Sequence, residues 1–105
     1  ATNTFFALTD PDPKVQVYIN EFRKRAGRNP NLHAASAYDS ALLLAEAIRK
    51  AGFNRKAIRD QLAQTKNFPG ITGKITFTPV GDVVRKYKIL VVENGQWVVK
   101  KDYTQ

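Results

Sequence analysis

The spacing of apolar residues changes at Phe68, and this change limits the possible fold more than any other feature of the chain. Before Phe68, apolar residues recur every three to four positions, which is typical of amphipathic helices. After it, apolar and polar residues alternate, which is typical of strands. The sequence therefore predicts an α/β chain in which helices come first and antiparallel strands follow. Its 105 residues allow one small domain.

Residues that start and stop helices divide the first part of the chain. The elements that they predict are a short strand over 3–9 and helices over 14–26, 34–51 and 55–65. Asp12 and Pro13 favour the first helix start, Asn54 favours the third, and glycines favour the ends at positions 27 and 52.

The helix predicted over 34–51 has one face of small and apolar residues. This face consists of Ala34, Ala37, Tyr38, Ala41, Leu42, Ala45 and Ile48. So many alanines predict that the helix packs closely against a neighbour.

Turn residues divide the second part of the chain into strands. Residues 71–77 read as one strand with a bulge at Gly73, and 78–82 read as a turn. Asn94-Gly95 is a strong hairpin signal between strands over 85–92 and 96–101, and the tail 102–105 is expected to be loose.

The net charge of +8 favours acidic partners, and nucleic acid is one of them. Three helices followed by a hairpin is also the element order of a winged-helix DNA-binding domain. Such a domain requires the basic groups at 23–28 and 55–59 to converge on one face, with Arg55, Lys56 and Arg59 near the DNA. The alternative is a soluble protein with a lysine-rich surface.

Side chains for catalysis or metal binding are scarce. His33, the only histidine, precedes Ser36 and Asp39 at helical spacing, but three neighbours on one helix cannot surround a substrate carbonyl. With one histidine and no cysteine, we expect no metal site, no cofactor and no enzymatic activity. The "GITGK" stretch lacks phosphate-loop spacing and precedes a strand rather than a helix. No apolar run is long enough to span a membrane.

Four stretches together resemble a known family. They are "AYDSALLLAEAIRKAG", "NRKAIRDQLAQT", "FPGITGKITFTPVGD" and "YKILVVENGQW". In this order and spacing the chain resembles the C-terminal portion of type I periplasmic binding proteins, the branched-chain amino-acid receptors of ATP-binding cassette importers. The resemblance covers nearly the whole chain, although members of that family are much longer. It implies a fragment of a two-lobed fold.

The resemblance also implies a division of the chain into parts. These are a hinge strand over 1–11, the helices and edge strand of one lobe over 12–82, and a hinge-crossing hairpin over 83–105, with the hinge strands themselves at 5–10 and 87–93. The implied function is that of a non-catalytic receptor for amino acids or similar small polar molecules, which docks on the membrane subunits of an importer. The implied location is periplasmic or extracellular, with a cell-surface tether in a Gram-positive source.

By position in this family, the ligand-binding residues are expected at the start of the long helix: His33, Ser36, Tyr38 and Asp39. The resemblance has Tyr38 pack over an aliphatic group and Asp39 pair with an ammonium or a hinge group. The alternative is that Tyr38 and Asp39 only brace the hinge. A fragment of this fold leaves apolar faces uncovered, so we expect the chain to associate with itself.

Overall fold

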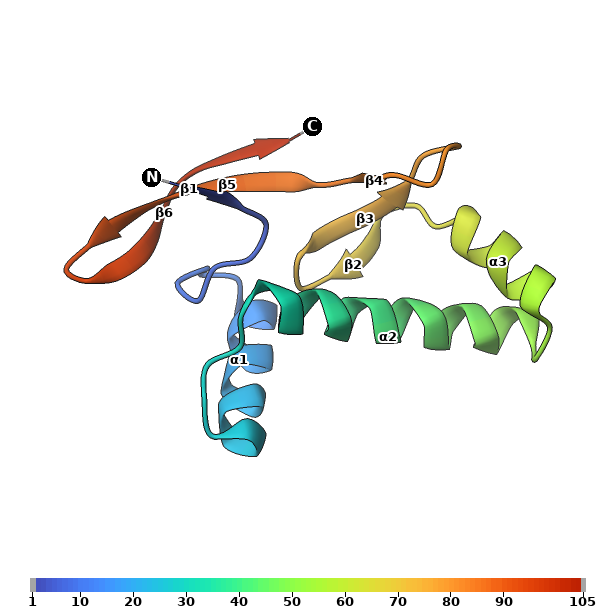
Figure 1. The fold of residues 1–105 in the computed structure, drawn as a ribbon, viewed down its shortest axis with the longest axis horizontal. Coiled ribbons are helices and arrows are strands. Elements are labelled where there is room, and N and C mark those ends of the chain that lie inside the picture. The colour runs from blue at the N-terminus through green and yellow to red at the C-terminus, as the bar shows by residue number, and fades with distance from the viewer. Residues whose placement is uncertain (1, 105) are drawn as a thin grey trace.

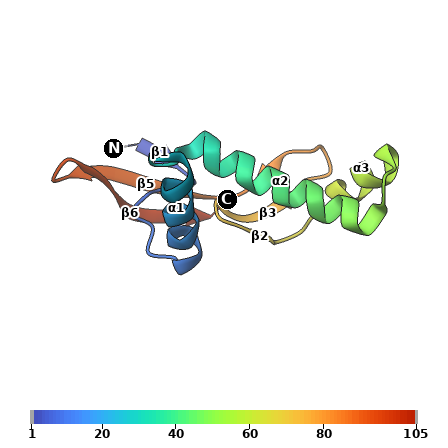
Figure 2. The same cartoon turned by 90° about the horizontal axis from the view of Figure 1, so that it is seen from below.

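The computed structural model describes residues 2–104, and it confirms that three helices precede antiparallel strands (Figure 1). The elements are β1 (Thr2–Thr4), α1 (Pro13–Ala26), α2 (Leu32–Ala51), α3 (Arg55–Ala63), β2 (Phe68–Gly70), β3 (Gly73–Phe77), β4 (Val83–Val84), β5 (Lys86–Glu93) and β6 (Gln96–Thr104). Figure 2 shows the molecule from below, with α2 extending from α1 at one end to α3 at the other.

Each helix begins at a side chain that caps it. The carboxylate of Asp12 accepts the Lys14 N–H at 2.9 Å, and the side chain of Asn54 accepts the Ala57 N–H at 2.9 Å, so both predicted starts are confirmed. Helix α2 begins two residues earlier than predicted, because the Asn31 side chain caps it through the N–H of Ala34, also at 2.9 Å.

The first sheet joins the two ends of the chain, in the order β1-β5-β6. The predicted hairpin is confirmed: β5 and β6 pair antiparallel, and both Asn94 and Gly95 have positive φ, as a two-residue hairpin turn of this kind requires. The prediction of a loose tail is wrong for residues 102–104, because β6 continues to Thr104. The pairing of β5 with β6 shifts register once, at a bulge between Ile89 and Leu90 of β5.

The second sheet has the order β2-β3-β4. The prediction of one strand with a bulge at Gly73 is wrong, because the chain reverses there. Gly70 pairs with Gly73, and Ile71 and Thr72 form the turn between them. Gly73 has a φ of 108°, a conformation that favours glycine, and it starts β3 instead of interrupting a strand.

The predicted strand over 3–9 is also wrong for most of its length. Only the residues up to Thr4 belong to β1, and the following segment 5–10 is irregular. Burial explains the difference, since Phe6 and Ala7 lie in the interior and the Asp10 N–H turns back to the Ala7 carbonyl at 3.2 Å.

The interior is small. Its main cluster comprises Phe6, Val15, Tyr18, Ile19, Ala35 and Ile71, contributed by the segment after β1, by both long helices and by the β2–β3 turn. The molecule measures 49 × 33 × 19 Å, with a radius of gyration of 15.3 Å. A compact domain of this length has a radius of gyration of roughly 13 Å. The chain is therefore extended, and much apolar surface stays outside the core.

Helix α2 buries a different face from the one the sequence singled out. Its buried residues are Ala35, Asp39, Leu43 and Ala47. On the predicted packing face, Tyr38 and Leu42 are each 42% exposed, and Ala37, Ala41 and Ala45 are exposed as well. Although Tyr38 lies near α1, most of that face is exposed among the described residues. None of the described helices has the length and apolar character needed to cross a membrane.

Candidate functional site

The start of α2 carries the four residues nominated from the sequence. His33 and Tyr38 are exposed, Ser36 is half-buried, and Asp39 is buried. Pro30 lies buried just before the helix and holds the preceding residue out of helical conformation, which keeps the start of α2 close to the interior. Sequence reasoning therefore located a real helix start, but its four residues face different surroundings.

The carboxylate of Asp39 is occupied by the turn between β2 and β3. One oxygen, Oδ1, accepts the Ile71 N–H at 2.9 Å. The other, Oδ2, accepts the Thr72 N–H at 2.9 Å and the Thr72 hydroxyl at 2.5 Å. With three hydrogen bonds the charge is compensated, although the residue is only 1% exposed. Asp39 thus attaches α2 to the β2–β3 turn, and its contact with a ligand or with a hinge group stays a prediction.

Tyr38 lies against another tyrosine of the interior. Its ring centroid is 4.7 Å from that of Tyr18 on α1, and packing of Tyr38 over an aliphatic group of a ligand stays a prediction. Burial raises the pKa of Tyr18, and the charge of Asp39 and then Tyr38 raise it further. Both tyrosines and Asp39 line a hollow of about 660 Å³ between α1 and α2.

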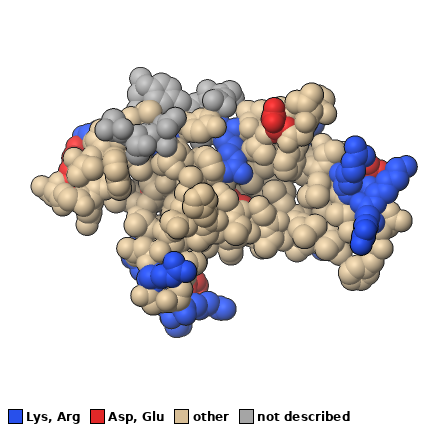
Figure 3. Space-filling view, in the orientation of Figure 1, with Lys and Arg blue, Asp and Glu red and all other residues tan. Residues whose placement is uncertain are grey.

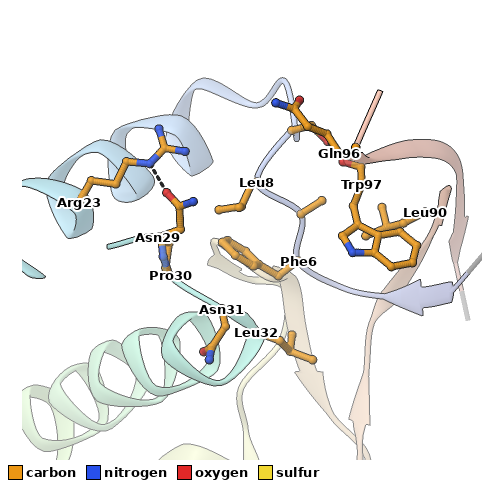
Figure 4. Close-up of a pocket in the computed structure, with 13 residues that line it drawn as sticks. Phe6, Leu8, Arg23, Asn29, Pro30, Asn31, Leu32, Leu90, Gln96 and Trp97 are labelled. Atoms are coloured by element: carbon orange, nitrogen blue, oxygen red, sulfur yellow. Dashed lines mark hydrogen bonds between the residues drawn. The ribbon is translucent and has the colours of Figure 1, made fainter. Parts of the chain in front are cut away.

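A second hollow, of about 590 Å³, lies on the side of the hairpin (Figure 4). Its walls come from the segment after β1, the α1–α2 loop and the β5–β6 turn. The labelled lining residues are Phe6, Leu8, Arg23, Asn29, Pro30, Asn31, Leu32, Leu90, Gln96 and Trp97. Trp97 stands across the hollow from Leu8, and the Thr9 hydroxyl donates to the Trp97 carbonyl at 2.9 Å. Arg23 and Asn29, which are hydrogen-bonded to each other, close one end.

The structure brings Tyr38 and Asp39 together at the α1–α2 hollow, whereas His33 and Ser36 line neither hollow. The residues of the hairpin-side hollow were not nominated from the sequence. The aromatic side chains of Phe6 and Trp97 are the only signal that could have marked them, since such side chains suit either a ligand site or an interior. Their convergence depends on long-range pairing that no local pattern contains.

An ion pair connects the two segments that the resemblance assigns to the hinge. Lys88 Nζ on β5 lies 3.4 Å from Asp10 Oδ2, and both side chains are only 12% exposed. The other oxygen of Asp10 accepts the Asp12 N–H at 2.9 Å, just before α1. The pair therefore fixes β5 to the entry of α1.

The basic groups do not form the surface that a winged-helix domain needs. Figure 3 shows Lys and Arg gathered in separate places, over the end of α1 and over α3. Figure 1 shows these two elements on different sides of the molecule. The arginines at 23–28 and 55–59 therefore fail to converge. Within residues 2–104, no three His, Cys, Asp or Glu side chains gather into a group that could hold a metal ion.

Comparison with known proteins identifies the fold. A family model described as periplasmic binding protein matches residues 1–96. The chain belongs to the periplasmic binding protein family. This confirms the resemblance seen in the sequence and disfavours the DNA-binding alternative, and it implies a periplasmic or extracellular location. No curated protein matches the chain.

Solved periplasmic binding proteins have the same fold as this chain. A putative branched-chain amino acid transporter protein from Rhodospirillum rubrum has 32% identity and a TM-score of 0.82, with 93% of this chain and 29% of that one covered. The substrate-binding protein LivJ from Streptococcus pneumoniae, in complex with isoleucine, has 30% identity and a TM-score of 0.81, with 98% and 29% covered. The leucine binding protein LivK from Thermotoga maritima has 25% identity and a TM-score of 0.82, with 97% and 30% covered.

The chain thus spans about 30% of the length of these solved relatives. They are two-lobed proteins, and the chain corresponds to a part of that fold. The hollows and exposed faces described above are therefore those of this part of the two-lobed fold.

Proposed function

We propose that the chain is part of a non-enzymatic solute receptor for an importer of amino acids or similar small polar molecules. The observation that carries this proposal is the family match over residues 1–96. Relatives at 30% and 25% identity, with isoleucine bound in one and leucine in the name of the other, support the substrate class. The membrane subunits of the importer are the proposed partners. In a Gram-positive source, we propose that a tether holds the receptor at the cell surface.

The proposed ligand contacts lie at the exposed start of α2. His33 and Tyr38 offer an imidazole and a phenol ring to solvent, and half-buried Ser36 carries a hydroxyl group on the same part of the helix. Asp39 belongs to the same site, but its carboxylate is committed to the β2–β3 turn. An amphipathic solute suits such a mixture of apolar and hydrogen-bonding groups.

The proposed mechanism is closure of two lobes about the strands near the Asp10–Lys88 ion pair. Closure removes water from the cleft, so that contacts with the charged groups of a solute become stronger. The importer would then recognise the closed shape, and no bond of the solute would change.

A binding titration tests the proposal. Leucine, isoleucine and, as a control, glucose are added to the chain while the NMR signal of the single imidazole, His33, is followed. We expect leucine or isoleucine to shift this signal in wild type, while the His33→Ala variant binds more weakly by calorimetry. If calorimetry shows no binding heat with either amino acid, the result would contradict the proposal that the chain itself binds amino acids of this kind.

We also propose that the chain associates with itself. The exposed face of α2 with Tyr38 and Leu42 supports this, together with Val17 of α1, which is 65% exposed beside the same hollow. An apolar surface of this kind, without a covering element among the described residues, is typical of an interface.

A further inference from the structure

We propose that Asp39 is a positioning residue: it fastens α2 to the β2–β3 turn and thereby fixes where His33 and Tyr38 stand. The effect of this attachment on solute binding rests on the proposed function. The fastening itself rests only on contacts within the chain.

The β2–β3 turn has the donors that a side chain with two acceptor oxygens can use. Two consecutive backbone N–H groups, of Ile71 and Thr72, point at separate oxygens of Asp39, and the Thr72 hydroxyl adds a third bond. Both Asp39 and Thr72 are almost completely buried, at 1% and 0% exposed. Asparagine has only one acceptor oxygen, so it would turn an NH₂ group toward one of these donors.

These hydrogen bonds depend on a close approach of the backbone at Gly70 to Asp39. A Cβ atom at Gly70 would lie 2.5 Å from Asp39 Oδ2 and 2.8 Å from its Cγ. No other glycine of the chain has such a neighbour, since at each of them a Cβ would meet nothing within 4 Å. The hairpin therefore comes as near to the Asp39 side chain as a residue without a Cβ permits.

The apolar packing of this part of α2 is modest: Ala35 lies in the main cluster, Leu32 packs against it and Tyr38 lies against Tyr18. Besides Asp39, the buried residues of the helix are Ala35, Leu43 and Ala47, and two of these are alanines with little surface to bury. Because small side chains contribute little to packing, the three hydrogen bonds of Asp39 carry a large share of the attachment. Tyr38 is its direct neighbour in sequence and His33 lies on the preceding turns, so this attachment, together with the contact between Tyr38 and Tyr18, sets their positions.

Amide hydrogen exchange and the His33 imidazole signal test the proposal without any ligand. In Asp39→Asn, we expect the amides of Ile71 and Thr72 to exchange at least tenfold faster, because each loses a bond to a charged acceptor. We also expect the His33 signal to shift. The matched control is Asp60→Asn on α3, where the carboxylate is half-exposed, and this variant should leave both readings unchanged.

A second pair of variants decides the question if Asp39→Asn does not fold. Thr72→Val removes one hydroxyl donor at nearly the same volume, and Thr72→Ser keeps the hydroxyl. Exchange about tenfold faster in Thr72→Val, with recovery toward wild type in Thr72→Ser, is the expected result. Equal exchange in all three proteins would overturn the proposal.

Amide exchange at the turn and the His33 signal test different parts of the proposal. Faster exchange at the turn with an unchanged His33 signal would show that Asp39 holds the hairpin without positioning the helix, and would overturn the positioning role. Failure of the chain to bind leucine or isoleucine would contradict the proposed ligand contacts and would leave the exchange rates and the His33 signal unchanged.

Discussion

Tyr18 brings a hydroxyl group into the interior, where none of the described residues is its hydrogen-bond partner. Its ring packs edge-on against Phe6, with centroids 6.2 Å apart, and lies 6.0 Å from Phe22. Removal from water disfavours the charged phenolate, and the nearby carboxylate of Asp39 disfavours it further, so both raise the pKa of Tyr18. This residue consequently makes stability depend on pH in the alkaline range.

The sign of that dependence follows from proton linkage. In the unfolded chain Tyr18 ionises near pH 10, whereas the folded protein keeps its proton to higher pH. The free energy of unfolding is therefore expected to fall as the pH rises above about 10. Urea unfolding at pH 8 and pH 10.5 measures the loss, which should be smaller in Tyr18→Phe. The control Tyr87→Phe should keep the wild-type loss, and an equal loss in all three proteins would contradict the assignment to Tyr18.

Gly70 offers a test of close packing at a single position. Gly70→Ala is expected to destabilise the protein by about 2 kcal/mol, because the new methyl group overlaps the Asp39 carboxylate and something must move. Chemical denaturation measures the change. The cost should be smaller when Asp39 is already alanine, since the clash is then absent, and a cost independent of residue 39 would show that the strain lies elsewhere.

Among the elements, α2 shows which features a local pattern can predict. Its existence and its end before Gly52 follow from apolar spacing and turn residues, both of which act over a few positions. Its buried face was not predictable, because Ala35 and Asp39 are set by the hairpin at Ile71 and Thr72, which lies far along the chain. From the sequence alone, an aspartate in an apolar helix is interpreted as a surface residue, because the groups that donate hydrogen bonds to its carboxylate are not known.

The side chain of Asn31 caps α2 and starts it at Leu32, two residues before the predicted start. Asn31→Ala is expected to cost about 1 kcal/mol, because the N–H of Ala34 loses its acceptor. Thermal unfolding followed by circular dichroism measures the cost, and Asn31→Ser should restore most of it. A similar loss of stability is expected for Asn54→Ala at α3. If Asn54→Ala lowered the stability and Asn31→Ala did not, the result would contradict the cap at α2.

The two glycine turns of the strand region differ in how readily they could be predicted. Asn94-Gly95 follows a common two-residue pattern, in which both residues take positive φ, and the hairpin was predicted correctly. The reversal at Ile71 and Thr72 has no such pattern, since both residues favour strands. It forms where Asp39 accepts their N–H groups, so a distant side chain replaces the usual turn chemistry.

At the scale of the whole molecule, the uncovered face of α2 predicts association. Leu42→Glu introduces a charge into this face and is expected to shift the protein toward monomer in light scattering at increasing concentration. Ser40→Glu adds the same charge at an exposed position outside that apolar face and serves as control. A wild-type protein that is monomeric over the whole concentration range would contradict the proposed association.

The sheet β1-β5-β6 draws its strands from opposite ends of the sequence, with Thr2 paired to Leu90 and Thr4 to Lys88. The β5–β6 hairpin closes a loop of two residues and can form within microseconds, whereas β1 can pair only after nearly the whole chain has been enclosed. The entropy of that closure makes β1 the last strand to join. During synthesis, the residues of β1 must therefore wait for those of β5 before they acquire a strand partner.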